Sequence, residues 1–263
     1  MKPLILIVAA GEGKRLYPVT KDVPKAFINI GNEKVIGKVV KDLPTGIEKA
    51  VLLRRAKKFE GLEHHLRDNY GFNDGNILYQ DRLTSSPRFP VRLSLVPLAY
   101  FLGHPPGFLS KNSKYLRQFD PVVIVPADII VNGLDYLDLL KFHQEQQADV
   151  TMPVVIGPVE GSNTRIYTVE DGRFVSATAY VHKDFARELP ANERLYTHEG
   201  TYVFGRRFFD LPFRKLLRKD HISPPFEGAY KSLKFVPYEG SFEWIDVRDA
   251  TNLRTARERY GNL

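Results

Sequence analysis

Apolar residues of this 263-residue chain gather in short unbroken runs, and stretches with helical periodicity lie between them. Unbroken apolar runs are typical of strands that are buried on both faces. The predicted strands are Leu4–Ala10, Ala50–Leu53, Val122–Val125 and Val150–Val155, and the predicted helices are Val35–Leu43, Lys57–Asn69, Phe108–Arg117 and Leu134–Gln147. This alternation predicts a mostly parallel sheet covered by helices, with a ligand crevice at the carboxyl ends of the strands.

The later part of the chain has a different pattern. Two strand-like segments flank Asp171-Gly172, which predicts a β-hairpin. The elements expected here are hairpin strands Arg165–Val169 and Phe174–Val181, strands Thr201–Phe204 and Phe242–Val247, and helices Phe208–Leu217 and Asp249–Arg259. We see no linker or repeat, so we expect a single domain over residues 1–263. The region from Gln80 to Pro106, rich in Pro and Arg, is predicted to be a long ordered loop near the site.

Composition narrows the class of protein. Hydrophobic residues make up 43% of the chain, and no apolar stretch approaches the roughly 18 residues of a membrane span. The chain has no cysteine, which excludes disulfides, and Met1-Lys2-Pro3 leads into the first strand without a signal-peptide pattern. We therefore expect a cytoplasmic protein with no membrane partner. The net charge of +7 favours anionic ligands, and the basic runs Arg54–Lys58 and Arg214–Lys219 are predicted to be solvated helix faces.

The segment after the first predicted strand carries the most specific chemical signal. Its glycines, Gly11 and Gly13, allow the backbone to turn sharply and to bring N–H groups close to a ligand. Lys14, Arg15 and Lys25 surround that turn with positive charge. The expected guest is therefore phosphate, as part of a nucleotide.

Two familiar phosphate loops do not fit this segment. A dinucleotide fingerprint needs a third glycine where Leu16 stands, and a P-loop needs Ser or Thr where Arg15 stands. The remaining pattern, Gly-x-Gly-x-Arg-Leu-x-Pro-x-Thr with Pro-Lys shortly after, resembles the signature loop of sugar-1-phosphate nucleotidyltransferases. A basic surface turn is the alternative interpretation.

The resemblance implies a three-layer Rossmann-like α/β nucleotidyltransferase fold, with a mostly parallel mixed sheet and an acceptor region that contains the β-hairpin. It implies a nucleotide-binding half over residues 1–157 and a sugar-phosphate-binding half over residues 158–263. The loop residues that it assigns to the nucleotide are Ala10, Gly11, Gly13, Lys14 and Arg15, and it gives catalytic roles to Arg15 and Lys25.

Asp128 follows a predicted buried strand directly, at the end where α/β sheets carry functional groups. A carboxylate there suits Mg²⁺, which prefers oxygen ligands and accompanies phosphates, and a turn cap is the alternative. Ala127-Asp128 resembles the strand-end Gly-Asp of the family, in which this aspartate is catalytic.

Asp246 lies in Trp244-Ile245-Asp246-Val247, which resembles a late Trp-x-Asp-Val element of the family. The resemblance implies that Asp246 completes the Mg²⁺ site together with Asp128. The alternative is that Asp246 caps the last helix, although Asp249 fits that role better.

The matches are weaker where the acceptor should bind. Segment 102–109 is similar to a family segment near the base and sugar, which assigns Gly103 to the nucleotide. Segment 199–204 is similar to a strand beside the sugar, which assigns Glu199 and Gly200 to the sugar phosphate. The family carries Glu-Lys-Pro after the hairpin, but Val175–Tyr180 has no charge, so Lys183 is the candidate substitute. His182 and His198 lack metal-ligand spacing and are expected at the surface or in hydrogen bonds.

The resemblance implies Mg²⁺-dependent joining of a nucleoside triphosphate and a sugar 1-phosphate, with release of pyrophosphate. The alternatives are transfer to a non-sugar phosphomonoester and a non-catalytic nucleotide-binding relative that acts as a regulatory subunit. Nucleic-acid binding ranks last, because the chain shows no nucleic-acid motif. The base, the sugar and the oligomeric state, a homo-oligomer included, stay open.

Overall fold

The computed structural model describes residues 2–80, 115–157, 163–180, 188–210 and 232–261. The chain forms two compact units, each built from segments that are distant in sequence. The terminal unit comprises residues 4–84, 124–134 and 242–263, and the central unit comprises residues 1–3, 85–123 and 135–241. The boundary between the units therefore differs from a single division after residue 157, and the assignment of two functional halves stays a prediction.

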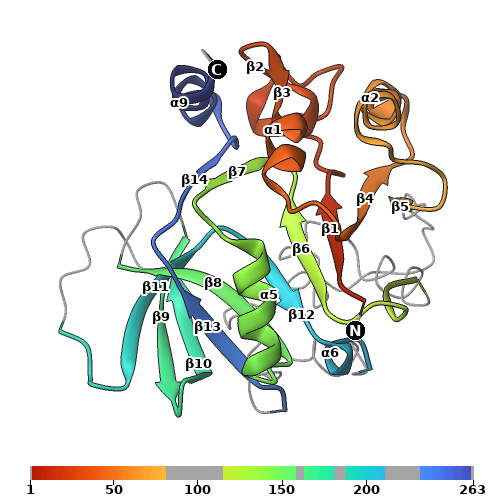
Figure 1. The fold of residues 1–263 in the computed structure, drawn as a ribbon. Coiled ribbons are helices and arrows are strands. Elements are labelled where there is room, and N and C mark those ends of the chain that lie inside the picture. The colour runs from red at the N-terminus through yellow and green to blue at the C-terminus, as the bar shows by residue number, and fades with distance from the viewer. Residues whose placement is uncertain (1, 81–114, 158–162, 181–187, 211–231, 262–263) are drawn as a thin grey trace, which may run out of the picture. The chain divides into compact units, whose positions relative to one another are not determined.

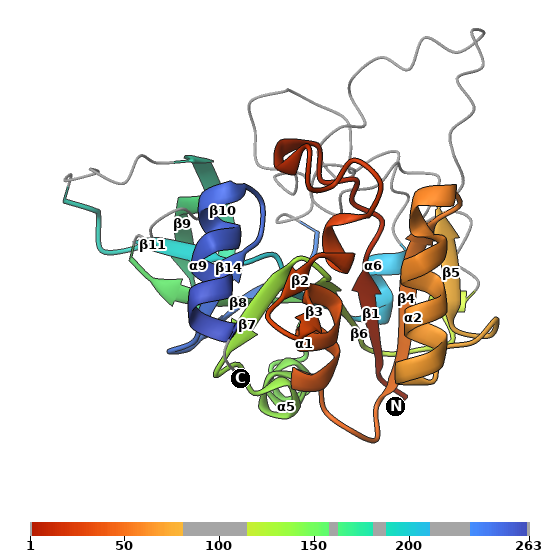
Figure 2. The ribbon, with the colours of Figure 1, turned by 90° about the horizontal axis from the view of Figure 1, so that it is seen from above.

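The terminal unit contains a row of strands that follow the predicted apolar runs (Figure 1). In order across the sheet they are β6 (Val122–Pro126), of which residues 124–126 belong to this unit, β1 (Leu4–Val8), β4 (Glu48–Arg54) and β5 (Ile77–Gln80). The pairs β1–β4 and β4–β5 are parallel, and Ile7 of β1 lies opposite Val51 of β4. Residues 4–7 are completely buried, as their unbroken apolar run predicts. The segment after β1 starts at the tip of its arrow (Figure 2), which is the edge where ligands bind in α/β sheets.

Two small antiparallel pairs complete the strands of the terminal unit. These are β2 (Asn29–Ile30) with β3 (Glu33–Lys34), and β7 (Ile129–Asn132) with β14 (Glu243–Asp246). An apolar cluster joins them to the loop after β1 and to the last helix; its members are Leu16, Ile28, Ile30, Val35, Ile130, Ile245, Val247, Leu253 and Ala256. This shared core fixes the loop relative to β7 and β14.

The helices of the terminal unit lie close to their predicted positions. They are the 3-10 turns η1 (Lys14–Leu16), η2 (Lys25–Phe27) and η3 (Lys57–Phe59), and the helices α1 (Val35–Asp42), α2 (Glu60–Tyr70) and α9 (Ala250–Tyr260). The carboxylate of Asp249 accepts the N–H of Asn252 at 2.9 Å and caps α9. Asp249 rather than Asp246 is therefore the cap of this helix.

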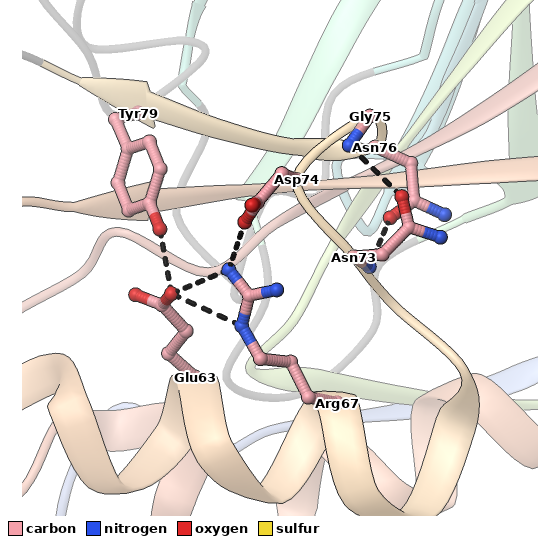
Figure 3. A network of polar contacts seen from close by, with 7 residues as sticks. All are labelled: Glu63, Arg67, Asn73, Asp74, Gly75, Asn76 and Tyr79. Carbon is pink, nitrogen blue, oxygen red and sulfur yellow. Dashed lines mark hydrogen bonds and ion pairs between the residues drawn. The ribbon is translucent and has the colours of Figure 1, made fainter.

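A polar network connects α2 to β5 and to the turn between them (Figure 3). The Glu63 carboxylate accepts from Tyr79 Oη at 2.7 Å and from Arg67 Nη2 at 2.8 Å, and Arg67 also contacts Asp74 at 2.6 Å. Within the turn, the Gly75 N–H donates to the Asn73 side chain. Each charged group of the network has a partner in it, so its role is to fix α2 against the sheet.

The central unit contains a second set of strands, in the order β11–β9–β10–β13–β8–β12. Their bounds are β8 (Val150–Ile156), β9 (Asn163–Glu170), β10 (Arg173–Tyr180), β11 (Glu193–His198), β12 (Tyr202–Phe204) and β13 (Phe235–Glu239), with helices α5 (Tyr136–Glu145) and α6 (Arg206–Asp210). β8 and β13 are parallel, and the other described pairs of this unit are antiparallel. The predicted hairpin is β9–β10, with positive φ at Asp171 and Gly172.

The structure confirms an α/β fold with a mixed sheet and a hairpin. The expected mostly parallel pairing holds for β1, β4 and β5, whereas every described pair of the central unit except β8–β13 is antiparallel. The strands β2, β3, β5, β7, β11 and β13 were not predicted. The loop expected from Gln80 to Pro106 lies outside the described residues except for Gln80, which ends β5. Most of the helices expected over Phe108–Arg117 and Phe208–Leu217 also lie outside them. Among the described residues, no helix is long and apolar enough to cross a membrane.

Candidate functional site

The loop after β1 folds back on itself at Gly13. This residue has φ 72° and immediately precedes η1. A Cβ atom at this position would lie 2.9 Å from Cγ2 of Thr20 and 3.1 Å from Cβ of Lys25. Thr20 Oγ1 donates to the Gly13 carbonyl at 2.6 Å. Glycine is required here both for its backbone conformation and for the close approach of the returning chain.

The first part of the loop presents unused hydrogen-bond donors. Within the described part of the chain, the amide N–H groups of Gly11, Glu12 and Gly13 have no hydrogen-bond acceptor. Gly11 is exposed, and a Cβ built on it meets nothing within 4 Å. Consecutive free N–H groups at a strand end suit an anion. The exposed side chains of Lys14 and Arg15 add positive charge beside them.

Asp128 follows β6 after a single residue, Ala127, at the same sheet edge as the loop. The N–H of Ala127 donates to the Val8 carbonyl at 3.1 Å, so this strand end is fixed beside the end of β1. The N–H of Val247 donates to the Asp128 carbonyl at 2.9 Å. These backbone bonds hold the segment of Asp246 beside Asp128.

Asp246 is directed away from the core by the alternation along β14. Its neighbours Ile245 and Val247 are buried in the apolar cluster, so Asp246 lies on the opposite face. In the β7–β14 pair it lies opposite Ile129, the residue that follows Asp128. Strand register therefore brings the two aspartates together.

Lys25 joins the two aspartates. Its Nζ lies 2.6 Å from Asp128 Oδ2 and 3.0 Å from Asp246 Oδ1. The Lys25 side chain is 9% exposed, against 33% and 27% for the aspartates. Burial acts to lower the pKa of Lys25, but the charges and hydrogen bonds of Asp128 and Asp246 outweigh burial and raise it. The pKa of Asp246 is also raised, by burial and by Asp128, against the effect of Lys25.

The carboxylate pair is the candidate metal centre of the terminal unit. Among the described residues, no group of three or more His, Cys, Asp or Glu side chains could hold a metal ion. The second oxygen of each aspartate, Asp128 Oδ1 and Asp246 Oδ2, has no partner in the described part of the protein. Two carboxylates with free oxygens are a donor set that Mg²⁺ uses when substrate phosphates supply further ligands.

Three further residues around the loop were missed by the sequence analysis. Arg54, at the end of β4, forms an ion pair with Glu12, and Lys58 donates to the carbonyls of Glu12 and Thr20. The prediction that Arg54–Lys58 is a solvated helix face is wrong for Arg54 and Lys58, which are only partly exposed, and right for Lys57. Because β4 is parallel to β1, both strands end at the same edge of the sheet. A predicted parallel pairing of these two strands could therefore have indicated that Arg54 and Lys58 lie near the loop.

The sugar-phosphate candidates belong to the central unit. Glu199 is buried, and its Oε2 accepts the N–H of Thr201 at 2.8 Å. Its Oε1 is buried without a hydrogen-bond partner among the described residues, and burial raises the pKa of Glu199 to about 7. Gly200 has φ 107°. His198 is buried beside Tyr202, with its Nδ1 3.2 Å from the hydroxyl, in agreement with a hydrogen-bonded role.

The remaining predicted residues, Gly103, His182 and Lys183, lie outside the described residues. The predicted site residues that the structure describes therefore fall into two groups, one in each compact unit. The terminal unit contains Ala10, Gly11, Gly13, Lys14, Arg15, Lys25, Asp128 and Asp246, and the central unit contains Glu199 and Gly200.

Known proteins with similar sequences are nucleotidyltransferases. A glucose-1-phosphate adenylyltransferase of Trichlorobacter lovleyi is 26% identical over 216 residues, which cover 78% of this chain and 48% of that protein. Another, of Geobacter metallireducens, is 26% identical over 292 residues, which cover 95% of this chain and 68% of that protein. This chain thus spans about half the length of the first relative and two thirds of the second.

A solved structure of UDP-glucose pyrophosphorylase complexed with UDP-glucose has a TM-score of 0.67 at 16% identity, over 100% of this chain and 99% of that chain. This likeness confirms the predicted nucleotidyltransferase fold. The profile of the nucleotidyl transferase family matches residues 3–260. The chain therefore belongs to the nucleotidyl transferase family, as its loop pattern predicted.

Proposed function

We propose that the chain joins a nucleoside triphosphate and a sugar 1-phosphate to give a nucleotide-sugar and pyrophosphate. The observation that carries this proposal is the ammonium of Lys25 between the carboxylates of Asp128 and Asp246. The same compact unit contains a loop whose first amide donors have no acceptor among the described residues. The adenylyltransferase names of two relatives also support this type of reaction.

In this reaction, an oxygen of the sugar phosphate attacks the α-phosphorus of the triphosphate. The bond between the α-phosphorus and the bridging oxygen breaks, and pyrophosphate leaves with the bonding electron pair. No protein nucleophile or base is needed, because the attacking oxygen is already an anion. The protein must instead hold two polyanions together and stabilise the charge of the transition state.

The cationic and N–H groups of the terminal unit suit this task. The amide groups of Gly11 and Gly13, with the exposed side chain of Arg15, would hold the triphosphate and the departing pyrophosphate. Lys25 would neutralise the α-phosphate and the incoming phosphate, because its ammonium keeps its charge over the physiological pH range. Ala10 and Lys14 would complete the nucleotide side of the loop.

The donor set supports Mg²⁺ as the metal of this site. Asp128 and Asp246 would hold the ion, because each combines a partly exposed carboxylate with an oxygen free of partners among the described residues. When bound, Mg²⁺ would supply charge neutralisation at the phosphates of both substrates. Lys25 would then set the spacing of the two carboxylates and limit their mutual repulsion.

The acceptor would be recognised by Glu199 and Gly200, with Lys183 on its phosphate and Gly103 near the nucleotide. The free Oε1 of Glu199 supports a role in binding a hydroxyl group, since a buried carboxyl oxygen without a partner is unfavourable. A cytoplasmic location and the absence of a nucleic-acid partner stay predictions from the sequence, and the oligomeric state stays open.

The proposal is tested by measuring pyrophosphate release from each of the common nucleoside triphosphates paired with a panel of sugar 1-phosphates, with and without Mg²⁺. We expect at least one pair to release pyrophosphate only when Mg²⁺ is present. Asp128→Asn should abolish most of this release and retain binding of the triphosphate.

The panel should include phosphorylated alcohols, because segment Val175–Tyr180 lacks the charged residues that the family carries there. Release with these acceptors alone would replace the sugar in the proposal. Binding of a triphosphate without release from any pair would contradict the enzymatic proposal and favour a non-catalytic nucleotide-binding relative.

A further inference from the structure

Lys58 lies outside the loop after β1 but makes hydrogen bonds to two parts of it. It belongs to η3, which follows β4. Its Nζ donates to the carbonyl of Glu12 at 2.7 Å and also to the carbonyl of Thr20. A single ammonium therefore connects the start of the loop with the segment that returns towards Lys25.

Other contacts hold the same stretch of backbone. The guanidinium of Arg54 forms an ion pair with the Glu12 carboxylate, and Thr20 Oγ1 donates to the Gly13 carbonyl at 2.6 Å. Lys58 also lies 5.6 Å from the ring centre of Tyr17. The loop is thus fixed through its carbonyls and side chains, while its first N–H groups stay free within the described residues.

The contact at Glu12 determines the direction of the next amide group. The Glu12 carbonyl and the Gly13 N–H belong to one trans peptide plane and point in opposite directions. When Lys58 holds the carbonyl, the N–H of Gly13 is directed away from Lys58. That N–H is one of the donors without an acceptor in the described part of the chain.

We propose that Lys58 is a positioning residue for triphosphate binding: by holding the carbonyls of Glu12 and Thr20, it fixes the loop with the Gly13 N–H directed at phosphate. The inference rests on the proposed function for the identity of the ligand. The role assigned to Lys58 is to hold the loop, because both hydrogen bonds of its ammonium within the described residues go to backbone carbonyls of the loop.

Lys57 provides a matched control. It is the preceding residue of the same 3-10 turn, it is exposed, and its side chain has no partner among the described residues. Lys57→Met and Lys58→Met remove the same charge from neighbouring positions. A general attraction of phosphate by positive charge would be weakened by both substitutions, whereas a positioning role belongs to Lys58 alone.

The experiment measures two properties of the full chain: calorimetric affinity for inorganic tripolyphosphate, and amide hydrogen exchange of the loop from Gly11 to Thr20. In Lys58→Met we expect the Kd to rise by about tenfold or more, because two hydrogen bonds from a charged donor are lost. Loop exchange should become faster, with β4 and α2 unchanged. Lys57→Met should change Kd by less than about threefold and leave loop exchange at the wild-type rate.

Lys58→Arg keeps the charge and donors, so it should restore most of the affinity and loop protection. If Lys58→Met does not fold, Lys58→Gln, which keeps one donating amide, should give an intermediate Kd and faster loop exchange. Equal Kd changes for Lys57→Met and Lys58→Met, or unchanged loop exchange in a folded Lys58→Met or Lys58→Gln variant, would overturn the inference. These readouts need no turnover, so a failed pyrophosphate assay would contradict the proposed function and leave this result standing.

Discussion

Lys25 Nζ lies 3.0 Å from Asp246 Oδ1, although 221 positions separate the two residues in sequence. The contact exists because β14 pairs with β7 directly after Asp128. It also assigns the acidic residues at the start of the last helix to separate tasks. Asp249 caps α9, and the side chain of Asp246 contacts Lys25.

This separation of tasks predicts opposite outcomes for two neighbouring substitutions. Asp246→Asn removes a charge beside Lys25 and should lower the turnover of the proposed reaction by about a hundredfold or more. Asp249→Ala should leave turnover within about threefold of wild type and destabilise the fold by about 1 kcal/mol, the typical contribution of a cap. Turnover assays and urea unfolding of both variants would check this. Equal losses of turnover would contradict the assignment of Asp246 to the site.

Lys25→Met should make the stability of the protein depend on Mg²⁺. Without the ammonium, two partly exposed carboxylates face each other, and we expect a loss of about 2 kcal/mol in EDTA, below the roughly 3–5 kcal/mol of a fully buried pair. Added Mg²⁺ should restore stability by mass action, and by more than in the wild type, whose lysine already neutralises the pair. Thermal unfolding across a Mg²⁺ series measures both effects.

The double variant Lys25→Met with Asp128→Asn is the control for this metal effect. It removes one of the two carboxylates, so most of the gain with Mg²⁺ should disappear. If wild type, the Lys25 variant and the double variant gain the same stability from Mg²⁺, the carboxylate pair is not the metal site.

Gly13→Ala tests whether the shape of the loop matters for phosphate. The new Cβ would meet Thr20 and Lys25, so we expect the Kd for tripolyphosphate to rise by about tenfold or more. Gly46→Ala is the matched control: Gly46 has φ 81° with nothing within 4 Å of a Cβ, and it precedes β4 at the opposite sheet edge. Both variants should lose about 1 kcal/mol of stability from backbone strain, and calorimetry should show weaker binding for Gly13→Ala alone. Equal affinities would contradict the prediction.

Much of this fold was predictable because its strands have simple patterns. The apolar run of β1 predicted a buried strand, and Asp171-Gly172 predicted the hairpin turn of β9 and β10. β13 was missed because only two apolar residues precede Pro237 and the strand ends two residues after it, whereas the apolar residues of its parallel partner β8 continue beyond Pro153. β7 was missed because a short apolar segment directly after Asp128 gives no period of its own.

The site was predictable where its residues follow a strand and unpredictable where they depend on packing. Asp128 could be located because it closely follows the apolar run of β6. Arg54 and Lys58 belong to a basic run whose composition is typical of an exposed segment. The parallel pairing of β1 with β4 brings them to the loop. Glu199 gave no sequence signal of its burial, since acidic residues are seldom fully buried.

Glu199 predicts a specific dependence of stability on pH. Burial raises its pKa from 4.5 to about 7, so between these values the folded protein binds more protons than the unfolded chain. The contribution of the protonated Glu199 carboxyl to the stability of the fold is therefore fully present below pH 4.5 and is lost as pH rises through 7. Glu199→Gln cannot ionise, so its stability relative to wild type should increase by about 3 kcal/mol between pH 4.5 and pH 8.

Urea unfolding at pH 4.5 and at pH 8 measures the stability difference between Glu199→Gln and wild type. Subtracting the difference at one pH from the difference at the other cancels any packing effect of Gln that is independent of pH. Glu170→Gln at the exposed end of β9 is the control and should give the same difference at both values. If Glu199 also binds the acceptor, Glu199→Gln should raise KM for the sugar phosphate and leave KM for the triphosphate unchanged. A stability difference that does not change with pH would mean that the Glu199 carboxyl is solvated. A pH-dependent difference with an unchanged acceptor KM would mean that it is buried for structure alone.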